Sequence, residues 1–470
     1  MRYRNAGIGG SDKELLEYTS SLRSDKEIVE ETIAVMIAHV KQLREKKLIP
    51  ARAAKCLLEA LKEALSNPDG ILKEGYEDVH EALENYLLEK CGKLAFYAPL
   101  GRSRNDHVAA AIRLRILRKL TIILEELVKF RDKIILKAKK HAGTPFPGHT
   151  HFQPAQALTY GHYLLSFEEE LSDYTDIMLN IIDKIAKSPL GSGALAGSGV
   201  PLDRRKLAST LGFKDIALNT LYATGSRSFI QIVSSLMACL AVTLSRISED
   251  YINWCHPSIS IIVPPREHVQ TSSLMPHKRN PATLEVLRAR MMKVIGIDMT
   301  IKSMEAKLPL GYNLDLQEIT PCLWESMNEI AEGIRVLSSF IEGAEPDKKK
   351  CMKIIKEHIG GATEVAEAIS IAKNKPYREA YMYVAKTLHD TQWDTDKALT
   401  VIEEETGMKL TGLREPEGQL KAKAVEGSPN PRFVQYMVNT SLERLNKHKN
   451  ILRCLVKTLT TIRSIEEITQ

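Results

Sequence analysis

The stretch Thr-Ser-Ser-Leu-Met-Pro-His-Lys-Arg-Asn-Pro, residues 271–281, places hydroxyls, one imidazole, two cations and one amide in a short segment. Asn280 is a favourable N-cap, and Pro281 suits the first position of a helix, where an N–H is not needed. No proline follows until Pro309, and apolar residues recur at helical spacing from Leu284 onward. The stretch therefore predicts a polar loop that leads into the N-terminus of a long helix.

The chemistry of this loop favours an anionic ligand. A helix N-terminus offers free N–H groups and positive potential. Lys278 and Arg279 add two positive charges beside it. We interpret residues 271–281 as a lid that closes on a carboxylate substrate.

Composition sets limits on the class of protein. A chain of 470 residues predicts about three domains, and 44% apolar residues permit a substantial core. The net charge of +6 fits anionic metabolites at least as well as nucleic acid. We interpret the basic residues between 444 and 457 as a solvated helix face, with an RNA-binding patch as the weaker alternative.

The cysteines and the N-terminus predict a cytoplasmic protein. The seven cysteines are scattered, odd in number and without a Cys-x-x-Cys pair, which favours buried thiols in a reducing compartment. The first residues, with Arg2 and Arg4, lack an apolar signal segment. The uncharged run after Arg227 carries Gln231 and several serines, so we expect a core helix there and not a membrane span.

Long proline-free stretches dominate the chain. Helical periodicity follows Asp106, Tyr160, Pro281 and Pro321, and we find no convincing alternating strand and no repeat. Residues 361–470 predict shorter helices separated by loops at prolines and glycine. The fold class predicted from these patterns is all-α.

Other polar segments lie at the helix breaks. Two arginines and an amide in residues 101–106 suit two-point recognition of a carboxylate, although plain surface charge is the alternative. In the loop 145–156, His151 beside Thr150 favours acid–base chemistry over metal binding, because no carboxylate or cysteine stands at ligand spacing. For Ser20, Ser21 and Asp25, which lie at a helix break, helix capping is the simpler interpretation. The glycine-rich loop 189–199 predicts close backbone approach to a ligand or a helix.

Taken together and in order, these segments resemble the fumarase/aspartase superfamily. Residues 271–281 resemble its Gly-Ser-Ser-x-Met-Pro-x-Lys-x-Asn-Pro signature. The argininosuccinate lyase family is similar in Gly-Arg-Ser-Arg-Asn-Asp at 101–106, in the motifs at 147–156 and 189–204, and in Tyr-Asn-x-Asp-Leu-Gln-Glu at 312–318. The matches extend from about residue 18 to residue 385, and the arginine-rich and Tyr-Asn motifs separate this family from others of the superfamily.

The resemblance implies a fold and an assembly. It implies three mostly helical domains, at residues 1–102, 103–361 and 362–470, of which the central one contributes long helices to the core of a homotetramer. Each active site would combine loops from three subunits. Neither a metal nor an organic cofactor is implied, and no nucleic acid or membrane partner.

The implied reaction is the cleavage of argininosuccinate into arginine and fumarate, a step of arginine biosynthesis. Ser272 matches the position of the proton-abstracting residue, and His151 matches the other catalytic position, on the acid side. Lys278 would stabilise the carbanion, and Glu285 would pair with the histidine of another subunit. The resemblance also implies substrate-binding roles for Ser21, Ser103, Arg104, Asn105, Thr150, Asn280, Tyr312 and Gln317.

The chain departs from the family pattern at several positions. Thr271 replaces the signature glycine, serines flank Arg227 where the family has acidic residues, and Pro99 and Leu100 replace His-Thr. Thr320 stands where the family has a lysine expected to contact the substrate. These departures keep two alternatives open: a fumarate-releasing lyase that acts on a different N-succinyl substrate, and a non-catalytic homologue like the crystallins. The order in which Ser272 and His151 act as base and acid also stays open.

Overall fold

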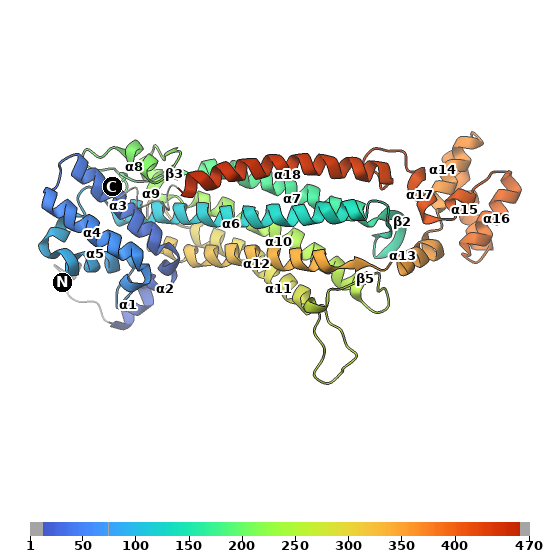
Figure 1. The fold of residues 1–470 in the computed structure, drawn as a ribbon, viewed down its shortest axis with the longest axis horizontal. Coiled ribbons are helices and arrows are strands. Elements are labelled where there is room, and N and C mark those ends of the chain that lie inside the picture. Colours follow the sequence, from blue (N-terminus) through green and yellow to red (C-terminus); the bar gives the residue numbers. More distant parts are fainter. Residues whose placement is uncertain (1–12, 74, 461–470) are drawn as a thin grey trace.

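The computed structural model describes residues 13–73 and 75–460, so Arg2 and Arg4 lie outside the described residues. Six long helices form an elongated bundle (Figure 1). They are α6 (Arg104–Lys140), α7 (Tyr160–Ile185), α10 (Ser228–Cys255), α11 (Ala282–Glu305), α12 (Ile319–Gly343) and α18 (Pro431–Thr460). The prediction of a mostly helical chain with a long central bundle is confirmed.

Helix α6 begins at a capping box. The Ser103 Oγ accepts a hydrogen bond from the Asn105 N–H at 3.3 Å, and the Asp106 Oδ1 accepts one from the Ser103 N–H at 3.1 Å. The 37 residues that follow contain no proline and bury an apolar face in the core. At about 1.5 Å per residue, α6 is about 55 Å long. Its two ends therefore lie far apart along the bundle.

Helix α10 is the only helix in the described part of the chain that is long and apolar enough to cross a membrane. However, 67% of its most apolar 18-residue stretch is buried inside the fold. It packs against α11, where the Ser234 hydroxyl donates to the Asp298 Oδ1 at 2.6 Å. This burial is what the sequence predicted for a core helix.

A unit of shorter helices lies at one end of the bundle (Figure 1). It comprises α1 (Lys13–Thr19), α2 (Leu22–Asp25), η2 (Lys26–Ile28), α3 (Val29–Glu45), α4 (Ala51–Ser66), η3 (Pro68–Ile71), α5 (Val79–Cys91) and η4 (Gly92–Tyr97). We call this the N-terminal unit. Its core is continuous with that of the bundle.

A disulfide joins Cys56 on α4 to Cys91 at the end of α5. The expectation of buried thiols was wrong for these two residues, and among the other five cysteines only Cys351 is buried. Packing of α4 against α5 brings their Cα atoms to 5.9 Å, although 35 positions separate them in the sequence. Spacing along the chain cannot reveal such a pairing, because it depends on how the two helices pack.

Replacing Cys56 by serine is expected to lower the free energy of unfolding by about 3–4 kcal/mol, because the bond closes a long loop in the unfolded chain. The thermal unfolding midpoint, measured with and without reductant, checks this. Cys239→Ser changes an exposed free cysteine and is the matched control. The prediction would be contradicted if the unfolding midpoint of the wild type were the same with and without reductant and the midpoint of Cys56→Ser were equal to it.

Smaller helices occupy the opposite end of the bundle (Figure 1). They are α13 (Lys348–Ile354), η7 (Ile355–Ile359, a π-helical turn), α14 (Ala362–Ala372), α15 (Tyr377–Asp390), α16 (Thr395–Thr406), η8 (Thr411–Leu413) and α17 (Pro416–Ala422). Helices α14 to α16 share a separate apolar core that includes Val365, Ile369 and Ile402. The three domain boundaries stay a prediction.

Helix α18 corrects the expectation of only short helices after residue 361. It has 30 residues and returns along α6 and α7 as part of the main bundle. The buried Arg131 of α6 explains part of this docking. Its guanidinium donates to the Glu168 Oε1 on α7 at 2.8 Å and to the His448 Nδ1 on α18 at 2.8 Å. Prolines 429 and 431 mark where the helix begins, but no proline interrupts it afterwards.

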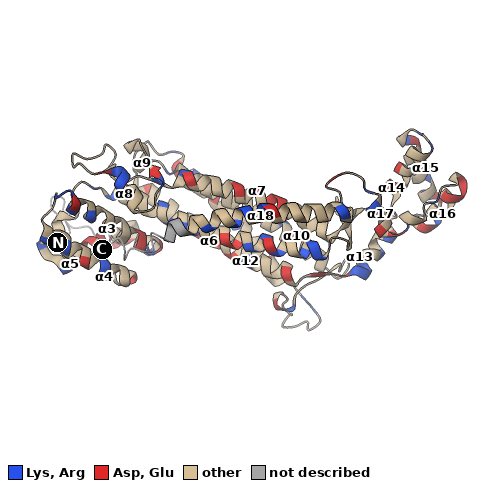
Figure 2. Ribbon diagram, turned by 45° about the horizontal axis from the view of Figure 1, so that its top comes forward, with Lys and Arg blue, Asp and Glu red and all other residues tan. Residues whose placement is uncertain are grey.

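The basic residues of α18 form part of mixed-charge surfaces. Lys449 pairs with Asp132 at 3.0 Å, and Arg444 lies 3.7 Å from Glu169. Figure 2 shows acidic and basic residues interspersed along the ribbon of the bundle. This arrangement agrees with the interpretation of a solvated helix face.

Short strands form three two-stranded ladders, which the sequence did not predict. They are β1 (Pro145–Thr150) with β2 (Gln153–Thr159), β3 (Lys187–Ser188) with β4 (Asp215–Ile216), and β5 (Ile262–Val263) with β6 (Glu345–Pro346). The β1–β2 pair is an antiparallel hairpin with an irregularity between Pro147 and His149. Its prolines disguised it as a loop, because proline is rare inside strands. The remaining short helices are α8 (Arg204–Thr210), α9 (Thr220–Gly225), η5 (Arg266–His268) and η6 (Leu314–Gln317).

Candidate active site

The N-terminus of α6 carries three of the predicted substrate-binding residues, Ser103, Arg104 and Asn105. The glycine-rich loop packs against this helix end, where the Asp106 Oδ2 accepts the N–H groups of Gly191 at 3.1 Å and Gly193 at 3.0 Å. The Asn105 amide donates to the Ala194 carbonyl at 3.2 Å.

Glycine is required in this loop for a steric reason. Gly193 has φ +59°, and a Cβ there would lie 2.5 Å from the carbonyl oxygen of Gly197. The predicted close approach of the loop to a helix is confirmed. The helix is α6, and the contact orients the residues at its start.

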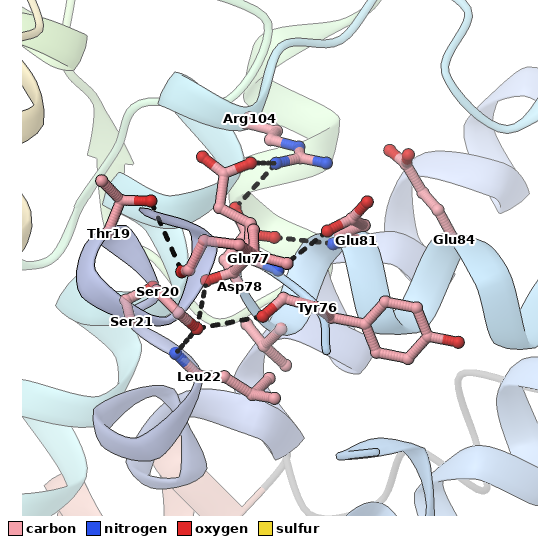
Figure 3. A network of polar contacts seen from close by, with 12 residues as sticks. Thr19, Ser20, Ser21, Leu22, Tyr76, Glu77, Asp78, Glu81, Glu84 and Arg104 are labelled. Carbon is pink, nitrogen blue, oxygen red and sulfur yellow. Dashed lines mark hydrogen bonds and ion pairs between the residues drawn. The ribbon is translucent and has the colours of Figure 1, made fainter. Parts of the chain in front are cut away.

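Arg104 points toward two carboxylates of its own chain (Figure 3). Its Nη1 lies 2.9 Å from the Asp78 Oδ2 and 3.5 Å from the Glu77 Oε2. Arg104 is therefore not simply a surface charge, since its side chain is 15% exposed and paired. Its role in binding a substrate carboxylate stays a prediction.

Ser21 faces a buried carboxyl group. Its Oγ donates to the Asp25 Oδ2 at 2.8 Å, and the Val79 N–H donates to the same oxygen at 3.1 Å. Although Ser21 precedes α2, its side chain makes no capping bond. The capping interpretation of Ser21 was therefore wrong, because Asp25 is the nearer partner of the hydroxyl.

A small cleft connects the residues of this end. It has a volume of about 40 Å³ and lies between the N-terminal unit, α6 and the segment before α12. The predicted residues Ser21, Tyr312 and Gln317 line it. Gln317 also donates to the Thr19 carbonyl at 3.0 Å, which ties η6 to the end of α1. One water molecule occupies about 10–15 Å³ of cavity volume, so the cleft has room only for a group of about the size of a guanidinium.

Sequence reasoning missed three charged residues of this cleft, Asp25, Asp78 and Arg227. Burial raises the pKa of Asp25 to about 7, although bonds from Ser21 and Val79 oppose this shift. Arg227 is 1% exposed and donates from its Nη1 to the Thr224 carbonyl at 3.0 Å. A signal was present for Asp25, since it follows Ser21 by one helical turn.

The tip of the β1–β2 hairpin carries Thr150 and His151. His151 is exposed and has φ +54°, and Phe152 beside it has φ +59°. Two successive left-handed residues make the tight turn that directs both side chains away from the bundle. His149, one of the other polar residues of this segment, is partly buried, and burial lowers its pKa.

Residues 271–281 form a loop that projects from the bundle into solvent (Figure 1). Reciprocal backbone hydrogen bonds between Gln270 and Asn280, both 2.9 Å, close its base. Within it, the Ser272 Oγ accepts the Leu274 N–H at 3.3 Å and the Met275 N–H at 3.2 Å. Lys278 is exposed. The predicted polar loop before a long helix is confirmed.

The start of α11 differs by one residue from the prediction. Its first residue is Ala282 and its N-cap position is Pro281, whose φ is −75°. Asn280 does not act as the cap, because its backbone is held in the bridge to Gln270. Glu285 lies in the first turn of α11 and is exposed.

One chain does not bring all predicted site residues together. The residues at the N-terminus of α6 and those of the hairpin are separated by the length of α6, about 55 Å. The loop 271–281 and Tyr312 flank opposite ends of α11, whose 24 residues extend about 36 Å. The structure therefore divides the predicted residues into three groups: the cleft group (Ser21, Ser103, Arg104, Asn105, Tyr312, Gln317), the hairpin group (Thr150, His151) and the loop group (Ser272, Lys278, Asn280, Glu285).

Within residues 13–73 and 75–460, no group of three or more His, Cys, Asp or Glu side chains is arranged to hold a metal ion. Three histidines do lie near one another, with ring centroids of His39 and His107 at 5.3 Å and of His80 and His107 at 6.5 Å. Burial lowers the pKa of His39 to about 4 and that of His80 to about 3. These histidines are therefore neutral parts of the core.

Comparison with known proteins identifies relatives over nearly the whole chain. A family model described as "Lyase" matches residues 9–296. The argininosuccinate lyase of Pyrobaculum calidifontis is 39% identical, over 94% of this chain and 98% of that protein. The enzyme of Pyrococcus furiosus is 38% identical, over 96% of each chain.

Solved structures of the superfamily share the fold. EDDS lyase in complex with formate superposes with a TM-score of 0.86 at 21% identity, covering 95% of this chain and 92% of that one. The class II fumarase of Schistosoma mansoni gives a TM-score of 0.72 at 16% identity, covering 83% of this chain and 90% of that chain.

Proposed function

From the premise that this chain belongs to the lyase family, and to its argininosuccinate lyase branch, we infer that it splits argininosuccinate into arginine and fumarate. The observation that carries this function is the similarity to argininosuccinate lyases over nearly the whole chain, which extends beyond the family model into the C-terminal helices. We also propose a cytoplasmic location, from the N-terminal sequence without an apolar signal segment.

The proposed chemistry begins with removal of a proton from the carbon next to a substrate carboxylate. A doubly charged aci-carboxylate forms, and the C–N bond to the guanidinium nitrogen then breaks as that nitrogen takes up a proton. Ser272 is the proposed base, and His151, oriented by Glu285 of another subunit, is on the acid side. A free serine is a weak base, so closure of the loop must activate it.

Positive charge is what the intermediate needs most. Lys278 and the N-terminus of α11 lie on the same loop–helix junction as Ser272. Donors placed where negative charge develops usually contribute the largest part of such catalysis. We therefore propose Lys278 and this helix end as the stabilisers of the aci-carboxylate.

The cleft group would bind the rest of the substrate. Asp25 and Asp78 line a space of guanidinium size, and opposite charge favours a guanidinium there. We propose that Ser103, Arg104 and Asn105 contact the carboxylates of the substrate. The remaining proposed contacts come from Ser21, Thr150, Asn280, Tyr312 and Gln317.

The separation of the three groups supports a shared active site. Because α6 and α11 hold the cleft group tens of ångströms from the hairpin group and the loop group, the cleft group of one chain cannot act with either of them on one substrate molecule. We propose a homotetramer in which the cleft group, the hairpin group and the loop group of each site come from three different subunits.

Fumarate release tests the function directly. Argininosuccinate is expected to be turned over, and other N-succinyl compounds much more slowly. Turnover of another N-succinyl compound alone would support the alternative suggested by Thr320 and Pro99. Absence of any turnover by the folded oligomer would favour a non-catalytic homologue.

Arginine binding is expected to release close to one proton per site near pH 6 and almost none above about pH 8. The pKa of Asp25 is raised from 3.8 to about 7, so this carboxyl is mostly protonated below that pH. A bound guanidinium favours the carboxylate, lowers its pKa and so expels the proton. Calorimetry in buffers of different ionisation enthalpy measures the release.

The control variants distinguish Asp25 from other carboxylates. In Asp25→Asn, any binding that remains should carry no proton release. Glu30→Gln removes an exposed carboxylate outside the cleft and should leave the release unchanged. If the wild type and Asp25→Asn released equal numbers of protons, the Asp25 carboxyl would be excluded as the source of the proton.

A further inference from the structure

A second cavity, of about 330 Å³, lies in the N-terminal unit and is much larger than the cleft of the candidate active site. Helix α5 forms one wall and η4 the other. Most of the lining is apolar, with Leu87 and Leu88 from α5 and Ala95 and Phe96 from η4. Volumes from about 300 Å³ upward are typical of small-molecule sites.

Arg102 lies at the polar end of this cavity. Its side chain is only 3% exposed, and its Nη2 pairs with the Glu84 Oε1. The Nε and Nη1 atoms of Arg102 are buried and have no acceptor among the described residues. A buried donor without an acceptor is destabilising, because it has lost its hydrogen bonds to water without replacing them. The site is thus short of an anionic oxygen, which a ligand carboxylate supplies.

Two carboxylates share this polar end, Glu81 and Glu84. Figure 3 shows both on the side of α5 that faces Arg104. A carboxylate accepts up to about four hydrogen bonds, so Glu84 can bind a second cation beside Arg102. The cavity therefore offers a positive group, a negative group and an apolar compartment within one enclosure.

We propose that this cavity binds a free α-amino acid with an apolar side chain. Its carboxylate bonds to Arg102, its ammonium group bonds to Glu84, and its side chain packs against Leu87, Leu88 and Phe96. A simple fatty acid would leave Glu84 with Arg102 as its cation and add no second one, and a simple amine would leave the Nε and Nη1 of Arg102 without an acceptor.

The cavity is connected to the candidate active site through Arg104. This residue lines the cavity and also pairs with Asp78, which lines the cleft. Pro99, where the chain departs from the family pattern, lies in the cavity wall. Occupancy is expected to move Arg104 and change the KM for the substrate. This last effect rests on the proposed function, whereas binding itself does not.

Isothermal titration of the full-length oligomer with L-leucine and with L-phenylalanine tests the proposal. Saturable binding of at least one is expected. For the leucine site, 4-methylpentanoate lacks the ammonium group and isoamylamine lacks the carboxylate. Each should bind at least tenfold more weakly than L-leucine. No binding of either amino acid, or equal binding of the single-charge analogues, would overturn the proposal.

Variants place the binding in this cavity. Arg102→Lys keeps the charge but removes the guanidinium donors, and Leu88→Phe fills the apolar compartment; both should weaken binding at least tenfold. Leu94→Phe makes the same change in size on η4 outside the lining and should bind normally. Should Arg102→Lys fail to fold, Leu88→Phe still decides the matter, because undiminished binding there would exclude the cavity. These titrations need no lyase activity, so their failure is distinguishable from failure of the proposed reaction.

Discussion

Replacing Ser272 by alanine is expected to lower kcat for fumarate release by about a thousandfold, the scale typical of losing a positioned acid–base group. Ser272 lies in the exposed loop 271–281, where its Oγ accepts the N–H groups of Leu274 and Met275. These bonds prepare the oxygen to carry negative charge. Steady-state assay of fumarate formation at saturating argininosuccinate gives the rate.

The neighbouring serine is the matched control. Ser273→Ala removes a hydroxyl from the same loop, but Ser273 is not a predicted catalytic residue, so its kcat should stay within about threefold of wild type. Oligomer size measured by light scattering should be unchanged in both variants. If Ser272→Ala and Ser273→Ala both had near-normal kcat, Ser272 would be excluded as the catalytic base.

Mixing two inactive variants is expected to restore activity if sites are shared between subunits. Asn105→Ala disables the cleft group, and Ser272→Ala disables the loop group. In one chain these groups lie at different ends of the bundle. Random reassembly of equal amounts should give some sites in which both groups are intact, with about a quarter of the wild-type rate.

A second mixture controls for nonspecific recovery. Ser103→Ala and Asn105→Ala both damage the cleft group, so every mixed site contains one defect and no recovery is expected. Unfolding and refolding of the mixtures, followed by the fumarate assay, provides the comparison. No recovery with the first pair, in an oligomer shown to contain both variants, would contradict the shared site.

Periodicity was a reliable guide to the helices of the bundle. Helices α6, α7, α10, α11 and α12 lie where proline-free apolar stretches predicted them. The same method failed where tertiary contacts select the structure. The β1–β2 hairpin contains three prolines, and its pairing depends on contacts between two segments. The docking of α18 depends on partners such as Arg131 and Glu168 that lie far away in the sequence.

The candidate site shows the same division. Motif resemblance selected the cleft, hairpin and loop residues, but it missed Asp25, Asp78 and Arg227 as parts of one cleft. A carboxyl such as Asp25 is ordinary in sequence. Its raised pKa comes from burial, and burial is a property of the packed chain.

By itself, the sequence determined the helical class, the family and the identity of the polar loops, because these depend on local periodicity and on residue types at fixed spacing. Only the tertiary structure decided that Cys56 bonds to Cys91, that α18 completes the bundle and that the cleft group lies far from the hairpin and loop groups. The physical reason is that contacts between distant segments depend on packing in three dimensions, and the rigid lengths of α6 and α11 keep those groups apart.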